Sequence, residues 1–411
     1  MLETPMLDNT RPDSAVTAPQ PTKDSKKFTP EVRKGLLGLG LGNALEWYDW
    51  MVFGLLSAFI GPNFFPNTDP LSATLSALAV FAVGFAFRPL GGVLLGTLAD
   101  RIGRRRVMLL SIMLMAGTTA IIAVTPSYAT IGAWAGIILL VCRVLQGIST
   151  GILLASLISF LCSLVLGGAV MGEWGWRVPF IIGALFGFVV LYLRRSLPET
   201  LKAEEMATNT PRAVWSGVRK HWLSVLAIIF VVGAAQAYNY AWNVGLPSAA
   251  RSGFKEDPTA VFALTTVLGV ILVAGSWIIG KLADGRQMSR WFLVTRVLAI
   301  PSVFLMLLYV QPGIGGFAAV LLGGSIVLVL NMTLYNVVSS SLMPKTIRGT
   351  GVALGYGIGV ALFGGTASYL LVWLQSLNLT WVFPVYVAVL SILSIVFYLA
   401  ARRTNGIFVG K

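Results

Sequence analysis

Four ionisable side chains lie near the middle of long apolar stretches of the chain: Glu46, Asp49, Arg88 and Arg143. If these stretches are membrane-spanning helices, a charge at that depth is costly and should face a cavity or another charge. We therefore treat these four side chains as a candidate site for handling a charged solute.

Glu46 and Asp49 are three residues apart and share one face of a helix. Two carboxylates held together in a poorly hydrated site disfavour double ionisation, so one of them takes up a proton more readily than a free side chain would. This pair is the candidate for proton coupling, with either carboxylate as the carrier.

Arg88 and Arg143 suit a carboxylate substrate, because a planar guanidinium makes two charge-assisted hydrogen bonds and keeps its charge. Two such residues would suit a dicarboxylate. The alternative is that they neutralise Glu46 and Asp49 as structural ion pairs. Both arrangements can hold at different stages of a transport cycle.

Polar residues at helical spacing mark one apolar stretch in the second half of the chain: Gln236, Asn239, Tyr240 and Asn243. We expect them to line a substrate cavity. Weaker candidates are Asn331, Tyr335, Asn336 and Tyr356. Hydrogen bonding between helices is the alternative role for all of them.

The elements that position these residues follow from composition. Of the 411 residues, 56% are hydrophobic and 11% are charged, which leaves more apolar surface than a soluble protein of this size could cover. The apolar runs are about 20 residues long, enough for a helix to cross a bilayer core. They lie near residues 36–60, 72–98, 107–125, 131–151, 152–168, 178–193, 223–246, 259–281, 291–310, 313–338, 350–373 and 380–401. The predicted fold is all-α and membrane-integral, with two six-helix halves.

The 30 Lys and Arg residues recur between these runs and form no single patch, which argues against a nucleic-acid-binding protein despite the formal charge of +14. Lys and Arg are retained on the cytoplasmic side, so both termini are expected in the cytoplasm. Only Arg177, Arg251 and Lys255 then face outward. The expected parts are a disordered tail 1–34, a half 35–194, a linker 195–221, a half 222–402 and a tail 403–411.

The chain has few of the histidine and cysteine residues that enzymes and metal sites commonly use. His221 is the single histidine, and Cys142 and Cys162 both lie in apolar runs, where a thiol behaves as a small hydrophobe. No nucleophile, base and orienting group occur together. We expect no enzymatic activity, no cofactor and no metal.

A charged turn occurs once in each half. Gly96-Thr-Leu-Ala-Asp100-Arg101-Ile-Gly103-Arg104 follows the second run, and Gly280-Lys-Leu-Ala-Asp284-Gly-Arg286 follows the eighth. Glycine permits close helix approach, Asp can face a helix N-terminus, and Arg can bind exposed C-termini. The repeat indicates two related halves. The residues expected to control conformational change are Gly96, Asp100, Arg101, Gly103, Arg104, Asp284 and Arg286.

The first of these turns, Gly-x-Leu-Ala-Asp-Arg-x-Gly-Arg-Arg-Arg, resembles the signature of the major facilitator superfamily. Within that superfamily the chain is similar to the metabolite:proton symporters. This similarity rests on the segments Gly42–Trp50, Gly84–Gly92, Arg143–Gly147, Glu173–Phe180 and Ile347–Tyr356. The resemblance implies the 12-span fold of that family and adds Tyr48 and Gln146 to the substrate-binding candidates.

The resemblance breaks near Gly151, where roughly 40 residues of the family pattern are absent. The apolar stretch from Ala133 to Val170 would make a helix about 57 Å long, nearly twice the hydrocarbon core. We therefore expect two spans here, the fourth and fifth, both incomplete. Either residues are missing from the sequence or the chain carries a real deletion.

The sequence thus predicts a secondary active transporter: a monomeric, proton-coupled symporter of a small organic acid that works by alternating access in the lipid bilayer. One alternative is a symporter of a zwitterion of the proline or betaine type. Another is a truncated membrane protein that does not transport. No Walker-type phosphate loop is present to suggest ATP as the driving force.

Overall fold

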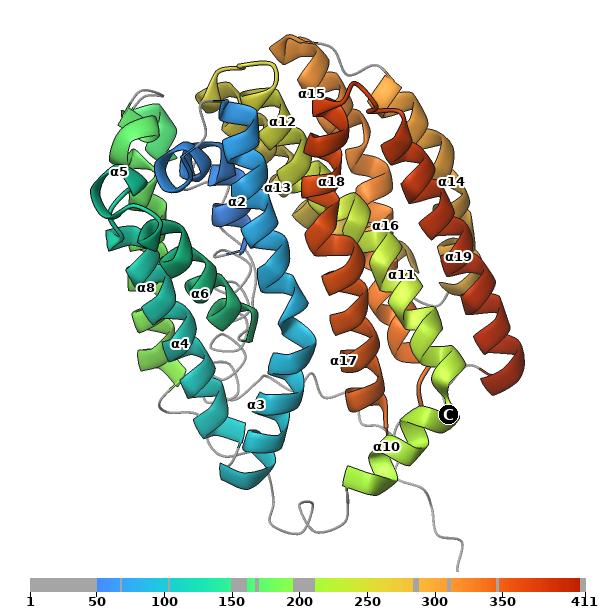
Figure 1. The fold of residues 1–411 in the computed structure, drawn as a ribbon. Helices are drawn as coiled ribbons and strands as arrows, with labels where there is room; N and C mark the ends of the chain where they lie inside the picture. The colour runs from blue at the N-terminus through green and yellow to red at the C-terminus, as the bar shows by residue number, and fades with distance from the viewer. Residues whose placement is uncertain are drawn as a thin grey trace, which may run out of the picture.

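The computed structural model describes residues 50–66, 69–102, 104–148, 161–166, 170–194, 211–283, 288–308, 312–344 and 347–406. Within these ranges the regular structure is helical, without a strand. Two groups of helices lie side by side, one drawn blue to green and the other yellow-green to red (Figure 1).

The first group contains helix Trp50–Phe64, α2 (Pro70–Ala86), α3 (Arg88–Ile102), α4 (Arg104–Val124), α5 (Tyr128–Ile131), α6 (Trp134–Ile148), the π-helical turn η1 (Met171–Gly175) and α8 (Arg177–Arg194). The second contains α10 (Pro211–Lys220), α11 (Trp222–Tyr240), η2 (Ala241–Gly245), α12 (Leu246–Ser252), α13 (Pro258–Ala283), α14 (Met288–Leu308), α15 (Ile314–Gly323), α16 (Ser325–Ser341), α17 (Arg348–Gly359), η3 (Val360–Gly364), α18 (Gly365–Ser376) and α19 (Val382–Asn405).

Among the described residues, eight continuous helical stretches are long and apolar enough to cross a membrane. Helices Trp50–Phe64 and Trp134–Gly147 are apolar but shorter. The predicted runs agree with these helices to within a few residues wherever the chain is described. The predicted break at Gly151 lies outside the described residues, as does most of the fifth run.

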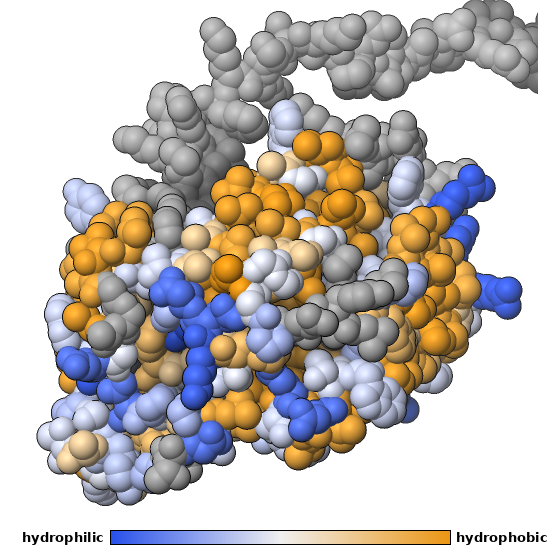
Figure 2. Space-filling view, turned by 90° about the horizontal axis from the view of Figure 1, so that it is seen from above, coloured by the Kyte–Doolittle hydropathy of each residue, from blue (hydrophilic) through white to orange (hydrophobic). Residues whose placement is uncertain are grey.

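The flanks of the helices expose large apolar side chains. Val165 is 80% exposed, Val124 74% and Trp277 65%. Surfaces of this kind aggregate in water but are the normal outer face of a membrane protein. Figure 2 looks down on the end where α12 and α15 lie, and it shows hydrophilic residues gathered there among apolar ones. The apolar flank and the more polar end are those of a helical membrane protein.

Glycine sets the distance between α2 and α6. A Cβ on Gly147 would overlap the carbonyl oxygen of Gly84, and a Cβ on Gly84 would lie 2.9 Å from the carbonyl oxygen of Arg143. The two backbones therefore cross in direct contact, as small residues allow in membrane helices. This crossing brings the arginine of α6 beside the end of α2.

Helix α11 lies at the centre of the second group. This helix begins the continuous helical stretch Trp222–Ser252. In the apolar 18-residue segment of that stretch 72% is buried, compared with 17% in the corresponding segment of Pro258–Gly280. The helix widens into the π-helical turn η2 just before Pro247. Proline has no N–H to donate to the carbonyl four residues back, and a π-helical turn accommodates the loss of that backbone hydrogen bond. Such turns often mark functional positions, and η2 carries Asn243.

The two groups are joined at the α12 end by hydrogen bonds. The hydroxyl oxygens of Ser57 and Ser248 lie 3.0 Å apart, and those of Ser163 and Thr259 lie 3.0 Å apart. Nη1 of Arg251 donates to the carbonyl oxygen of Leu55 at 2.6 Å. The molecule is therefore closed at this end.

Candidate functional site

Arg88 lies at the junction of α2 and α3. Pro89 lacks the N–H that would continue α2, so the helix is interrupted at Phe87 and resumes at Arg88. The guanidinium carbon of Arg88 lies 4.4 Å from the centre of the Phe85 ring and 4.5 Å from that of Trp50. The side chain is 9% exposed, so the charge is held within the protein.

Arg143 reaches the same place from α6. Its guanidinium carbon lies 3.8 Å from the centre of the Phe53 ring and 5.6 Å from that of Trp50, and the side chain is fully buried. Trp50 thus contacts both arginines. A guanidinium desolvated over an aromatic face gains about 2 kcal/mol, so these rings stabilise the two buried cations.

An aromatic cluster continues from this cationic pair into the second group of helices. Trp50 packs on Phe85 with ring centres 4.1 Å apart, and Phe85 packs edge-on against Tyr240 of α11 at 4.9 Å. Phe81 also packs against Phe85 and Tyr240. The cluster therefore spans the boundary between the two groups.

Behind Tyr240, the polar side chains of α11 form a hydrogen-bonded chain. Nδ2 of Asn243 donates to Oδ1 of Asn239 at 3.0 Å, and Nδ2 of Asn239 donates to Oε1 of Gln236 at 3.2 Å. Nε2 of Gln236 donates to the hydroxyl oxygens of Tyr335 at 3.1 Å and Tyr356 at 3.4 Å. The chain links α11 to α16 and α17, so the two tyrosines belong with the α11 candidates.

Gln146, Asn331 and Asn336 are the remaining predicted binding residues that the structure describes. Nε2 of Gln146 donates to the hydroxyl of Thr119 on α4 at 3.0 Å, a bond between neighbouring helices. Nδ2 of Asn331 donates to the carbonyl oxygen of Val327 one turn back on its own helix. Asn336 is exposed.

Six predicted residues lie outside the described part of the chain: Glu46, Tyr48, Asp49, Gly103, Asp284 and Arg286. Of the remaining conformational candidates, Gly96, Asp100 and Arg101 lie in α3, and Arg104 begins α4. The roles of all these residues stay predictions.

Two buried arginines were not singled out by the sequence analysis. Arg251 was expected to face outward and Arg296 lies within the predicted run 291–310, and the two residues are 7% and 1% exposed. Arg296 lies in α14 and donates from Nη2 to the carbonyl oxygen of Val231 at 2.5 Å. Arg251 lies over Phe59, which belongs to the other group of helices, and Arg296 lies over Phe292, four residues before it on α14. The spacing of Arg296 and Phe292 alone could have indicated this second pair.

The arrangement combines two buried cations on one side of an aromatic cluster with neutral donors and acceptors on the other. The cations attract an anion and can grip a carboxylate through paired hydrogen bonds. The amides and tyrosines can bind uncharged polar groups of the same molecule. Such an arrangement suits a small solute that has one charged end and one polar end.

Comparison with known proteins shows which family the chain belongs to. The sequence profile described as Major Facilitator Superfamily matches residues 153–362, which is half of the chain, and that of the Sugar (and other) transporter family matches residues 39–163. The chain is 28% identical to the alpha-ketoglutarate permease of Escherichia coli K12, covering 93% of this chain and 97% of the permease. It is 30% identical to a putative proline/betaine transporter of Staphylococcus haemolyticus, over 83% of this chain and 81% of that one.

The alignment with the permease runs over 432 positions, more than the 411 residues of this chain, so the permease contains residues without a counterpart here. Among solved structures, that of a D-xylose-proton symporter superposes with a TM-score of 0.66 at 16% identity, covering 93% of this chain and 99% of the other. The fold is the same, with two helical groups about a central boundary. The chain belongs to the Major Facilitator Superfamily of membrane transporters.

Proposed function

We propose that this transporter moves a small organic acid together with a proton, with Arg88 and Arg143 binding the carboxylate. The observation that carries the proposal is the convergence of both guanidinium groups on Trp50, at 4.5 and 5.6 Å from the ring centre. Ionisable side chains buried in a membrane protein usually mark a functional site, and two guanidinium groups at one place suit an anionic solute. A dicarboxylate supplies two such anionic groups.

Chain connectivity supports a role for Asp49 and Glu46 as proton carriers. Consecutive Cα atoms lie about 3.8 Å apart, so Asp49 must be adjacent to Trp50, which contacts both arginines. Four residues span at most about 14 Å, which limits how far Glu46 can lie from the same ring. A carboxylate near the arginines competes with the substrate for them, and protonation of that carboxylate frees the cations. Proton uptake and substrate binding are then linked.

The neutral chain on α11 is proposed to bind the remainder of the substrate. Tyr240 packs on Phe85, which contacts Arg88, while Gln236, Asn239 and Asn243 bond one another along the same helical stretch as Tyr240. One solute is therefore proposed to contact both groups of helices. In this structure all four are largely buried, and access requires the groups to separate at one end. That requirement is the basis of alternating access.

The closure at the α12 end supports this cycle. The bonds Ser57–Ser248 and Arg251–Leu55 join the two groups there and must break for the substrate to enter from that side. From the distribution of basic residues, we propose that this end faces outward and that both termini lie on the cytoplasmic side of a bacterial inner membrane. On that orientation the charged turns at Gly96–Arg104 and Asp284–Arg286 are proposed to face the cytoplasm and to control opening. The transporter is proposed to act as a monomer, since the site lies within one chain.

A zwitterion such as proline or betaine is the second candidate substrate, because the relatives include putative proline/betaine transporters at 30% identity. The aromatic cluster offers a physical basis, since aromatic faces bind quaternary ammonium groups. However, the guanidinium group of Arg88 already lies over the rings of both Trp50 and Phe85. The geometry therefore favours the organic acid.

Substrate choice is tested with the purified 411-residue chain in liposomes. Labelled mono- and dicarboxylates, proline and betaine are supplied with and without an imposed pH gradient, acidic outside. Accumulation of a carboxylate that depends on the gradient supports the proposal. Accumulation of betaine or proline alone would support the second candidate, and no uptake of any solute would support a membrane protein that does not transport.

A further inference from the structure

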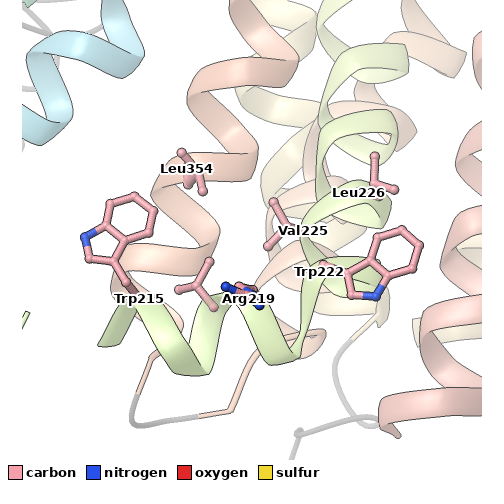
Figure 3. A pocket seen from close by; sticks show the side chains of 7 residues that line it. Trp215, Arg219, Trp222, Val225, Leu226 and Leu354 are labelled. Carbon is pink, nitrogen blue, oxygen red and sulfur yellow. The ribbon is translucent and has the colours of Figure 1, made fainter. Parts of the chain in front are cut away.

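A pocket away from the transport site lies at the end of the molecule opposite α12. It has a volume of about 420 Å³ and is lined by Trp215, Val218, Arg219, Trp222, Val225, Leu226 and Leu354. These residues come from three helices: α10, the beginning of α11, and α17. Figure 3 shows Arg219 on α10 with Trp215 on one side and Trp222 on the other. All but one of the lining residues are apolar or aromatic.

Helix α10 is held firmly in place. Val218 is 5% exposed, and a Cβ on Gly217 would lie 3.0 Å from Cγ2 of Ile347, so this face packs closely on the chain before α17. The backbone turns sharply at His221, whose amide and ring nitrogen both approach the carbonyl oxygen of Gly217. The pocket is therefore a fixed feature between α10 and the transmembrane helices.

The exposed side of α10 and the start of α11 carry residues typical of a membrane surface. Trp215 and Trp222 are 46% and 56% exposed, and Trp222 begins a membrane-spanning helix. Tryptophan favours the boundary between lipid headgroups and acyl chains. A short helix with tryptophan and basic residues on its exposed side lies in the plane of that boundary. The pocket thus opens at headgroup depth.

Charge selects among the molecules present at that depth. Arg219 is the one charged residue in the lining, and its side chain is exposed beside the apolar wall. A guanidinium binds a phosphate through paired hydrogen bonds, whereas the apolar wall of Val225, Leu226 and Leu354 suits an acyl chain. One molecule that carries a phosphate and an acyl chain satisfies both.

We propose that this pocket binds an anionic phospholipid, with its phosphate on Arg219 and an acyl chain against Leu226 and Leu354. The site stands apart from the transport chemistry and does not depend on which solute is carried. On the orientation proposed above, the lipid belongs to the cytoplasmic leaflet. Bound there, it ties α10, the only described helix between the two groups, to the membrane surface.

The test is native mass spectrometry of the purified transporter titrated with phosphatidylglycerol or phosphatidylcholine of identical acyl chains. A single basic residue at a membrane surface contributes about 1 kcal/mol, or about fivefold in affinity. The wild-type chain should bind its first phosphatidylglycerol about fivefold more tightly than phosphatidylcholine. Arg219→Gln should remove that preference, and Leu354→Trp, which fills the pocket, should weaken the binding of both lipids.

Arg403→Gln is the matched control. Arg403 is also an exposed arginine, at the end of α19, and that end is near α11 because Nδ2 of Asn405 donates to the hydroxyl of Ser224. This variant should keep the fivefold preference. The proposal is overturned if Arg219→Gln keeps the preference, if both arginine variants lose it equally, or if the wild-type chain shows none. Because the readout is lipid binding, failure here is distinct from failure of the proposed transport activity.

Discussion

The hydroxyl oxygen of Ser57 lies 3.0 Å from that of Ser248, although 191 residues separate them in the sequence. Ser248 is on α12, and it also approaches the carbonyl oxygen of Gly54 at 3.4 Å. The helix Trp50–Phe64 therefore contacts α12 side chain to side chain at the closed end of the transporter.

Replacing both serines with cysteine should allow a disulfide to lock that end. Hydroxyls 3.0 Å apart place the two Cβ atoms close to the range that a disulfide requires. If the contact opens in every cycle, Ser57→Cys/Ser248→Cys should lose uptake after oxidation and recover it after reduction. Each single variant is the control, since the native Cys142 and Cys162 are buried. Full uptake by a chain shown to be cross-linked would mean that this end stays closed during transport.

The helix crossing beneath the arginines should be intolerant of added volume. A Cβ on Gly147 overlaps the carbonyl oxygen of Gly84, so Gly147→Ala should lower the Tm in detergent, at a cost of about 1–3 kcal/mol. Gly117 on α4 has open space at the same position and is the matched control. Gly117→Ala should leave the Tm unchanged or raise it, because alanine is the better helix former. Equal Tm values for the two variants would remove the crossing as a constraint.

The polar chain on α11 should contribute to substrate affinity. Gln236→Ala deletes the side chain that bonds Asn239, Tyr335 and Tyr356, and leaves their buried polar atoms short of partners. Such a loss is worth about 1–3 kcal/mol, so the KM for uptake should rise about tenfold or more. Asn331→Ala should change the KM little, because Nδ2 of Asn331 bonds to a carbonyl of its own helix. A KM unchanged in Gln236→Ala would leave the chain a purely structural role.

Much of this architecture follows from the sequence, because the bilayer reduces the problem to a count of apolar runs. The predicted run 223–246 corresponds to α11 with its extension, and 380–401 to α19. Arg88 and Arg143 were expected near Glu46 or Asp49 because their depths match. The structure brings both arginines to Trp50, and the two carboxylates lie outside the described residues. The spacing of Gln236, Asn239 and Asn243 also placed them on one face, where they now bond one another.

The details that the sequence does not give depend on packing between distant segments. Arg251 and Arg296 are near the ends of apolar runs, and only the fold shows that aromatic rings and backbone carbonyls hold them inside. The hydrogen bond from Gln146 to Thr119 likewise depends on α4 lying beside α6. The aromatic cluster did have a signal: Phe81, Phe85 and Arg88 follow at helical spacing on one face of α2 and its continuation.

Removal of the proposed proton carrier should separate two modes of transport. Asp49→Asn should abolish uptake driven by a pH gradient but keep exchange of internal for external substrate, because exchange requires no net release of a proton. Glu46→Gln is the comparison that identifies which carboxylate carries the proton. If both variants accumulate substrate as well as the wild-type chain, neither carboxylate has a part in coupling.

The central claim is that Arg88 and Arg143 bind the carboxylate of the substrate, and the most direct measurement is the KM of labelled dicarboxylate uptake into liposomes under a pH gradient. Arg88→Lys and Arg143→Lys keep the positive charge but lose the paired hydrogen bonds of the guanidinium. Each bond to a charged group is worth about 1.5–3 kcal/mol, so we predict that the KM rises about 10- to 100-fold in each variant while the Tm stays near that of the wild-type chain. A wild-type KM in both lysine variants, from a transporter that does accumulate the dicarboxylate, would contradict the account.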